Sequence, residues 1–279
     1  MIDLDILFEP FRYSFMIKAF IICFVIAIPT SLLSCFLVLK GWALLGDAIS
    51  HAILPGIILA FIFNIPLLFG AFVSGLLCAV LTGYISNNCR VKPDTVMGVV
   101  FSGFFGIGMI LYFLVNSNIH LDYILFGNLL GIENHEMKSV IPLSILVSSI
   151  IIIKWKDYLL YSFDLVQAKA SGLKVNILHY VLLSIISVTV VITLSATGLI
   201  LAVGLIIAPG AIAFLLTRQF SNMLIISVLI CVFSMFFGTY LSFFIDSAPA
   251  PTIILVLTIL FFIALFRKIL INSKNTILS

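Results

Sequence analysis

An aspartate and a histidine, Asp47 and His51, stand four residues apart inside an apolar run that covers residues 42–63. Four residues are about one helical turn, so both side chains project from the same face of a helix. Ionisable groups inside a membrane span are costly and generally serve a function. A carboxylate oxygen beside an imidazole nitrogen suits a divalent transition metal. The spacing therefore predicts a metal-binding pair.

The composition places this pair in a membrane protein. Hydrophobic residues make up 63% of the 279 residues and charged residues only 9%, whereas soluble domains contain about 25% charged residues. Apolar runs near the ~20 residues that cross a bilayer recur along the whole chain. The sequence therefore predicts one all-α transmembrane domain over residues 1–279, a polytopic bundle of eight or nine helices. The nine expected spans are 14–39, 43–63, 67–86, 96–115, 140–153, 177–195, 198–217, 222–244 and 252–266, and 119–131 is a candidate for an additional interfacial or re-entrant segment.

The charges indicate how the bundle is oriented, because Lys and Arg are retained preferentially on the cytoplasmic side. We expect the N-terminus outside and the C-terminus in the cytoplasm. With nine crossings, this places most of the basic residues inside: Lys40, Arg90, Lys92, Lys154, Lys156, Lys169, Lys174, Arg218, Arg267, Lys268 and Lys274. The net charge of +3 reflects this asymmetry and gives no reason to expect nucleic acid as a partner.

Pro55 follows the Asp47–His51 pair on the same expected span. At about 1.5 Å per residue, His51 lies roughly 16 Å from Lys40, near the middle of a hydrocarbon core of about 30 Å. Proline offers no N–H to the carbonyl four residues earlier, which here is that of His51. We expect Pro55 and Gly56 to open the helix beside the pair, as where transporter backbone lines a pathway. The alternative is an Asp–His hydrogen bond that only joins two helices.

A second expected span is also irregular. Residues 198–211 combine Pro209 with three glycines, the last of which is Gly210, inside one apolar stretch. A broken backbone and close helix contacts are both expected there. The spacing of Gly98, Ser102 and Gly106 is typical of helix packing.

The longest cytoplasmic loop, 154–176, contains a short amphipathic segment at 162–173. Its expected helix has Asp164 at the N-cap and Gly172 just past the end. Such a helix offers an apolar face to a partner, or it lies on the membrane surface. On the outer side, one loop gathers five polar residues that could funnel cations or contact a binding protein, or are simply solvated: His120, Asp122, Glu133, His135 and Glu136.

These segments resemble the ABC-3 family of integral membrane subunits, found in ABC importers for manganese, zinc or iron. The similarity runs from about Phe15 to Phe266. Residues 44–56 match the family pattern Leu-Gly-Asp-Ala-x-x-His-Ala-x-x-Pro-Gly without a gap, and the 204–217 run also matches. In the loop, the matching residues are Phe163, Asp164, Ala168, Ala170 and Gly172, although Leu165 and Val166 replace the usual Pro-Glu.

The resemblance implies a mechanism. Two permease subunits, identical or different, would form a pathway in the bacterial inner membrane, cytoplasmic ABC ATPase subunits would drive it through the 163–173 helix, and an extracytoplasmic metal-binding protein would deliver the ion. Asp47 and His51 would ligate the transported metal, manganese or iron in preference to zinc, and no permanent cofactor is expected. The chain has no Gly-Lys dipeptide, so it lacks a Walker A loop for ATP.

Two other classes remain open. A proton-coupled secondary transporter could use Asp47 and His51, and it would work without an ATPase. An intramembrane metalloenzyme is disfavoured because the sequence has no HExxH or GxSxG motif.

Overall fold

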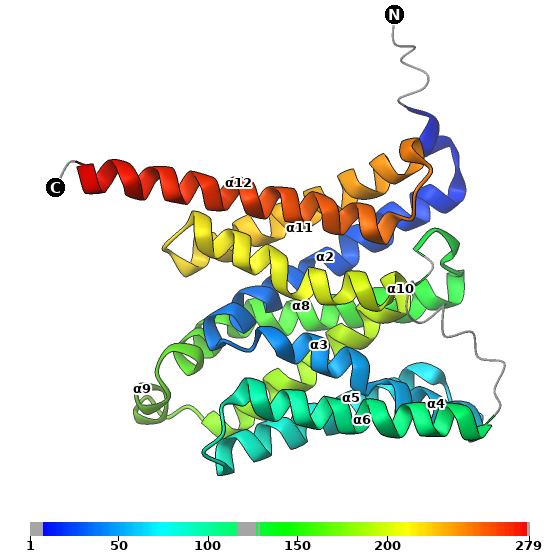
Figure 1. Cartoon of the computed structure of the whole chain (residues 1–279), viewed down its shortest axis with the longest axis horizontal. Coiled ribbons are helices and arrows are strands. Elements are labelled where there is room, and N and C mark those ends of the chain that lie inside the picture. Colours follow the sequence, from blue (N-terminus) through cyan, green and yellow to red (C-terminus); the bar gives the residue numbers. More distant parts are fainter. Residues whose placement is uncertain (1–7, 116–126, 128, 278–279) are drawn as a thin grey trace, which may run out of the picture.

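The computed structural model describes residues 8–115, 127 and 129–277, and within them the regular elements are all helical. Eight of the helices are long and apolar enough to cross a membrane, which agrees with the predicted all-α bundle (Figure 1). In chain order the elements are η1 (Glu9–Arg12), α2 (Ser14–Lys40), α3 (Ala43–Ala52), α4 (Leu54–Ile62), α5 (Leu67–Asn88), α6 (Pro93–Val115), η2 (Leu129–Gly131), α8 (Asn134–Phe163), α9 (Leu165–Ala170), α10 (Val175–Leu216), α11 (Phe220–Ile245) and α12 (Pro249–Ile277).

The expected spans correspond to these helices, but several of them have other bounds. The span 43–63 is divided into α3 and α4 at Ile53. The span 140–153 is only the middle of the 30-residue α8, because Lys154, Lys156 and Asp157 continue the helix instead of ending it. Of the candidate segment 119–131, residues 129–131 form a 3-10 turn, and most of the remainder lies outside the described residues.

The sixth and seventh expected spans both fall in α10, which has 42 residues. A single crossing needs only about 20. Gly198 interrupts the helix with φ 79° and ψ 171°, a conformation outside the helical region. Figure 1 shows the chain running from left to right before this point and back to the left after it. The break predicted between residues 195 and 198 is therefore present at the first glycine of the irregular run.

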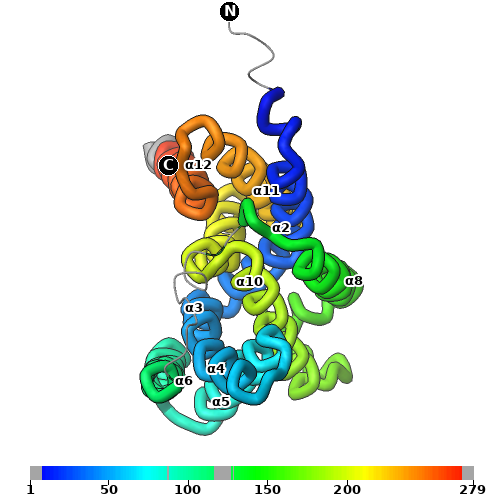
Figure 2. Tube along the Cα trace, turned by 90° about the vertical axis from the view of Figure 1, so that its right-hand side faces the viewer, coloured from blue at the N-terminus to red at the C-terminus, as the bar shows by residue number. Residues whose placement is uncertain are grey.

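Helix α10 is the centre of the bundle. It contacts α2, α3, α5, α8, α11 and α12, and in Figure 2 it lies between the group α3–α6 and the group α2, α11 and α12. Two apolar clusters reflect this division, one around Leu33, Ile49 and Ile186 and the other around Ile26, Leu205 and Ile253. The element that carries Asp47 thus packs directly on the central helix.

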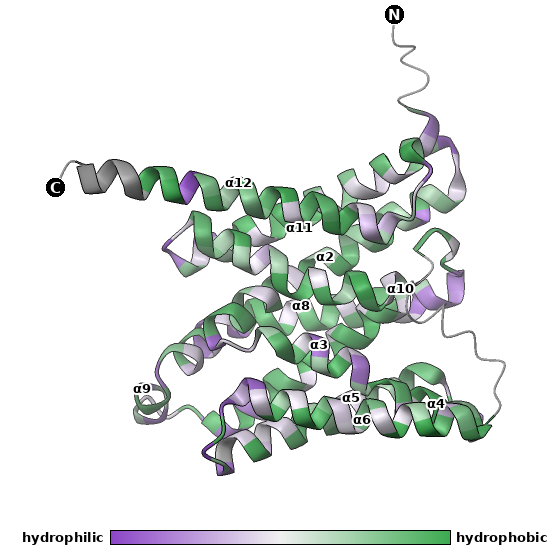
Figure 3. Ribbon diagram, viewed as in Figure 1, coloured by the Kyte–Doolittle hydropathy of each residue, from purple (hydrophilic) through white to green (hydrophobic). Residues whose placement is uncertain are grey.

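The two ends of the bundle differ. Helix α2 begins at the right-hand end in Figure 1, whereas α9 and the end of α12 lie at the left-hand end. Figure 3 shows hydrophobic colour along the helices and hydrophilic colour mainly at the ends, with an exception inside α3. That exception is the stretch containing the candidate metal pair.

Candidate metal pair and coupling segment

Asp47 and His51 lie on α3 and face each other across one helical turn. The His51 Nε2 atom is 3.5 Å from Oδ1 of Asp47, and the two side chains are 29% and 35% exposed, respectively. The predicted pair is therefore present as a contact within one helix. It does not join two helices, as the alternative interpretation required. One side of the pair is open, so an ion could reach both the carboxylate and the imidazole.

The His51 ring is held by two aromatic residues of α6. It stacks on Phe101 at a centroid distance of 5.9 Å and meets the edge of Phe105 at 5.5 Å. These rings are one helical turn apart on α6, so they restrict the imidazole from one side. The sequence pattern did not reveal this role, because Phe101 and Phe105 are apolar residues in an apolar span.

Gly46 lets α3 lie close to α10. A Cβ atom on Gly46 would come within 2.9 Å of Cγ2 of Ile206, closer than side-chain carbons pack. The residue directly before Asp47 is thus fixed against the second half of α10, and this contact sets the position of the metal pair relative to the central helix.

The helix expected over 43–63 is divided two residues before Pro55. Ile53 separates α3 from α4, although its own dihedral angles remain close to helical. The hydroxyl of Ser74 on α5 donates a 2.6 Å hydrogen bond to the carbonyl of Ala52. Gly56 lies against the backbone of Gly70, where a Cβ on either glycine would collide with the other's carbonyl. The interruption is therefore supported by α5.

The second Pro-Gly pair, Pro209 and Gly210, lies within α10 where that helix crosses α2, and the only non-helical residue inside α10 is Gly198, so the irregularity expected at this pair falls at the first glycine of the run. The Ser34 hydroxyl donates to the carbonyl of Ile207 at 2.9 Å and accepts from the N–H of Gly210 at 2.8 Å. Ser34 on α2 thus bonds backbone groups on both sides of Pro209. The Pro-Gly pair follows Ile206, the residue that packs on Gly46, by about one turn.

The coupling segment contains a shorter helix than expected, α9, with six residues. Its predicted caps are confirmed: Asp164 accepts hydrogen bonds from the N–H groups of Val166 and Gln167, and Gly172 has φ +80°. The side chains of Phe163 and Val166 are 76% and 77% exposed, and Ala168 is buried. Ala170 is exposed at the end of the helix. The segment therefore presents an apolar surface at its start and is anchored through Ala168.

The five polar residues predicted in the outer loop lie far along the chain from Asp47 and His51. Two of them, Glu133 and Glu136, have a local structural role. Glu133 and Glu136 form a capping box at the start of α8, in which the N–H of Glu133 donates to Oε2 of Glu136 at 3.2 Å. His135 borders a cavity between α5, α8 and α10. His120 and Asp122 lie outside the described residues. A cation-funnelling role for this loop stays a prediction.

A third cluster was not found from the sequence. The Tyr161 hydroxyl lies 2.7 Å from Nδ1 of His179, Lys40 Nζ is 3.4 Å from the centre of the Tyr161 ring, and Trp42 meets His179 edge to face. These residues join the two helices that flank α9 to the turn between α2 and α3. His179 is thus a residue near the start of α10 with a structural partner.

Two protein ligands do not complete a metal site. Among the described residues, there is no group of three or more His, Cys, Asp or Glu side chains that could hold an ion. Carboxylate and imidazole donors nevertheless suit manganese, ferrous iron and zinc, and the open side of the pair leaves room for further ligands. Chemically, the arrangement fits transient binding better than a closed structural site.

Comparison with known proteins places this geometry in a family. Residues 12–268 match the ABC 3 transport family. The chain is 48% identical to the chelated iron transport system membrane protein YfeD of Yersinia pestis, over 92% of this chain and 86% of that protein. It is 41% identical to the manganese transport system membrane protein MntB of Synechocystis sp., over 93% and 85%.

A solved structure agrees with these relatives. The fold is similar to a chain of PsaBC from Streptococcus pneumoniae in complex with Fab, with a TM-score of 0.83, 32% identity and coverage of 94% of this chain and 95% of that chain. With its eight apolar helices, this protein is a multi-pass protein of the bacterial inner membrane. The sequence match, the shared fold and the helical bundle together establish that the chain belongs to the ABC 3 transport family.

Proposed function

We propose that this protein is the membrane permease subunit of an ATP-binding cassette importer that moves a divalent transition metal into the cytoplasm. Manganese or iron is favoured, since relatives at 48% and 41% identity are named for transport of chelated iron and of manganese. Zinc is also compatible with the ligand types. The observation that carries the proposal is the Asp47–His51 contact of 3.5 Å on the half-open face of a membrane helix.

The metal would bind Asp47 and His51 transiently near the middle of the membrane. Neither side chain is fully buried, and the Phe101 and Phe105 rings orient the imidazole. The remaining ligands would come from water, backbone carbonyls or a second permease subunit. A second subunit fits on the α6 side, because the small residues expected to pack there are unpartnered within the described chain: a Cβ on Gly98 or Gly106 would meet nothing within 4 Å.

ATP hydrolysis would take place on separate cytoplasmic subunits. The chain has no Gly-Lys dipeptide for a phosphate-binding loop. The exposed Phe163 and Val166 beside α9 offer an apolar surface for the ATPase. This proposal orients α9 and the C-terminal end toward the cytoplasm and the start of α2 toward the outside, where an extracytoplasmic metal-binding protein would deliver the ion.

The test is metal uptake by proteoliposomes that contain the permease with its ATPase and binding protein. Asp47→Ala and His51→Ala should each abolish manganese and iron uptake, because each removes one of the two proposed side-chain ligands, while the complex still assembles. Asp157→Ala is the matched control: it removes a carboxylate that pairs with Lys154 at 3.3 Å, away from α3, and uptake should persist. Normal uptake by either α3 variant would remove the pair from the mechanism.

The same vesicles separate the importer from a proton-coupled transporter. A hydrolysis-deficient ATPase should stop uptake by the importer, whereas a secondary transporter would continue to accumulate metal under an imposed proton gradient. Competition among manganese, ferrous iron and zinc then identifies the preferred ion.

A further inference from the structure

A basic pocket lies at the end of the bundle that also carries α9. It has a volume of about 160 Å³ and is formed where the end of α10 meets the second half of α12. Three cations border it, namely Arg218, Arg267 and Lys268, together with Thr217 and the apolar residues Phe214 and Ile271. None of its lining residues belongs to α9 or its flanking turns, and Figure 1 shows α12 at the opposite edge of the bundle from α9, so the pocket is distinct from the coupling segment.

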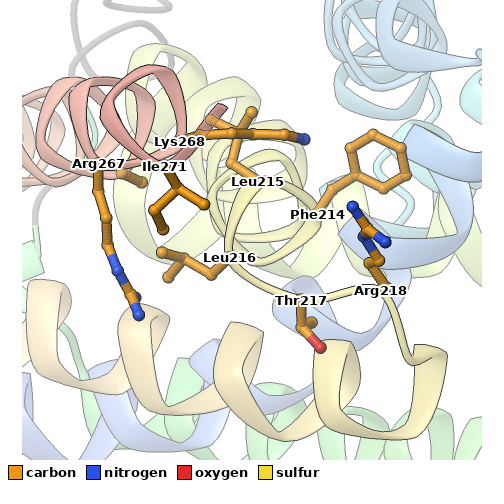
Figure 4. A pocket seen from close by; sticks show the side chains of 9 residues that line it. Phe214, Leu215, Leu216, Thr217, Arg218, Arg267, Lys268 and Ile271 are labelled. Carbon is orange, nitrogen blue, oxygen red and sulfur yellow. The ribbon is translucent and has the colours of Figure 1, made fainter. Parts of the chain in front are cut away.

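The three cations surround the opening from two sides. Figure 4 shows Arg267 extending along one side of Leu216, while the Lys268 amine and the Arg218 guanidinium lie on the other side, near Phe214. Lys268 Nζ is 5.6 Å from the Phe214 ring centre. In the described part of the chain, none of the three forms a salt bridge with a carboxylate. The positive charge of the pocket is therefore not neutralised by a carboxylate of the described residues.

The depth of the pocket matches the boundary of the membrane. Arg267 lies 18 residues after Pro249, the start of α12, and Leu216 lies 18 residues after the break at Gly198. At about 1.5 Å per residue, each is roughly 27 Å from the opposite end of its helix, close to the hydrocarbon thickness of about 30 Å. The cations thus lie at headgroup level, and Phe214 and Ile271 lie beside them.

We propose that this pocket binds the phosphate group of an anionic phospholipid from the cytoplasmic leaflet. Arg and Lys between membrane helices on the cytoplasmic side suit anionic headgroups, and guanidinium groups bind phosphate oxygens with two parallel hydrogen bonds. Free phosphate has the same charge chemistry, but the apolar Phe214 and Ile271 beside the cations favour a ligand with acyl chains. The assignment of the pocket to the cytoplasmic leaflet rests on the orientation given under the proposed function. Lipid binding at the pocket does not require that the protein transports a metal.

The test measures lipid retention by the purified permease–ATPase complex. The complex is exchanged into vesicles of phosphatidylcholine with or without phosphatidylglycerol, extracted, and examined for bound lipid by native mass spectrometry. We expect phosphatidylglycerol to be retained in preference to phosphatidylcholine. A triple variant, Arg218→Gln, Arg267→Gln and Lys268→Gln, should weaken this preference at least about ten-fold, since each basic residue near a membrane surface contributes roughly five-fold.

Two matched variants distinguish a pocket from general charge attraction. Arg90→Gln, Lys92→Gln and Lys156→Gln together remove the same charge from the same end of the bundle, and this variant should retain phosphatidylglycerol. Ile271→Trp keeps all three cations but fills the pocket at a half-exposed position, and it should lose the lipid. Equal loss in the charge control, or unchanged retention in Ile271→Trp, would overturn the proposal.

The unfolding temperature of the complex distinguishes binding of a phospholipid from binding of free phosphate. Phosphatidylglycerol should raise the unfolding temperature of the wild-type complex and leave the triple variant unchanged. Inorganic phosphate at equal concentration should not reproduce the shift, and an equal effect of inorganic phosphate would overturn the lipid assignment. Because neither readout measures uptake, a negative result here leaves the importer proposal intact.

Discussion

The Tyr161 hydroxyl and Nδ1 of His179 lie 2.7 Å apart. This contact joins α8 and α10, the helices that precede and follow α9 in the chain. Tyr161 lies near the end of α8, and His179 lies in the first turns of α10. Lys40 covers the Tyr161 ring and Trp42 contacts His179, so the same contact reaches the turn before α3. The base of the coupling segment and the helix with the metal pair therefore share one polar cluster.

Tyr161→Phe should destabilise this junction. His179 Nε2 already has no hydrogen-bond partner among the described residues, and the variant would leave Nδ1 unpaired as well. Loss of a buried partner costs about 1–3 kcal/mol. We expect a lower unfolding temperature in detergent and faster hydrogen exchange across α9. Tyr84→Phe, which removes an exposed hydroxyl from α5, is the control, and equal effects of the two variants would contradict a specific role for the bond.

The sequence predicted the helical bundle and the metal pair for the same physical reason. Long apolar runs stand out against charged loops, and Asp47 and His51 stand out against an apolar run. The caps of α9 could also be predicted, because Asp164 and Gly172 act on neighbouring backbone groups. Both features depend on residues that are close in the sequence: differences in hydropathy between neighbouring segments, and hydrogen bonds between a side chain and the backbone a few residues away.

Contacts between distant residues could not be predicted in this way. Ser34 and Gly210 are 176 residues apart, and no single-chain periodicity relates them. Phe101 and Phe105 are as apolar as their neighbours, so their contact with His51 has no signature in the sequence. The extra length of α8 was missed because charged residues that continue a helix beyond the membrane look like the end of a span.

Gly56→Ala should destabilise the support for the helix break beside the metal pair. A Cβ at Gly56 would collide with the backbone of Gly70 on α5. The clash cannot be relieved by rotating a side chain, because the closest of the atoms that collide with the new Cβ belongs to the backbone. Overpacking typically costs about 1–3 kcal/mol. The expected result is a lower unfolding temperature and less folded protein after extraction. Gly98→Ala is the matched control in another membrane helix, because its Cβ would meet nothing within 4 Å; an equally unstable Gly98→Ala variant would refute the packing argument.

Phe101→Leu should weaken metal transport without abolishing it. The variant keeps both proposed ligands but removes the ring on which His51 stacks at 5.9 Å, so the imidazole is held less firmly. Loss of groups that orient a metal ligand typically costs 10–100-fold in affinity or activity, and we expect about ten-fold lower uptake at low metal concentration. Phe113→Leu, at a side chain 72% exposed on the same helix, should transport normally. Normal uptake by Phe101→Leu would show that stacking does not position His51.

Ser34→Ala should loosen the crossing between α2 and α10. The Ser34 hydroxyl bonds two backbone groups of α10 on either side of Pro209, the carbonyl of Ile207 and the N–H of Gly210. The variant removes both of these interhelical hydrogen bonds, so the cost should fall within the ~1–3 kcal/mol range for loss of buried hydrogen-bond partners. Ser102→Ala removes a hydroxyl that bonds only within its own exposed helix face and should change the unfolding temperature much less. Because Ile206, one residue before this bridge, packs on Gly46, Ser34→Ala should also increase hydrogen exchange in α3, and unchanged exchange there would show that this crossing does not support α3.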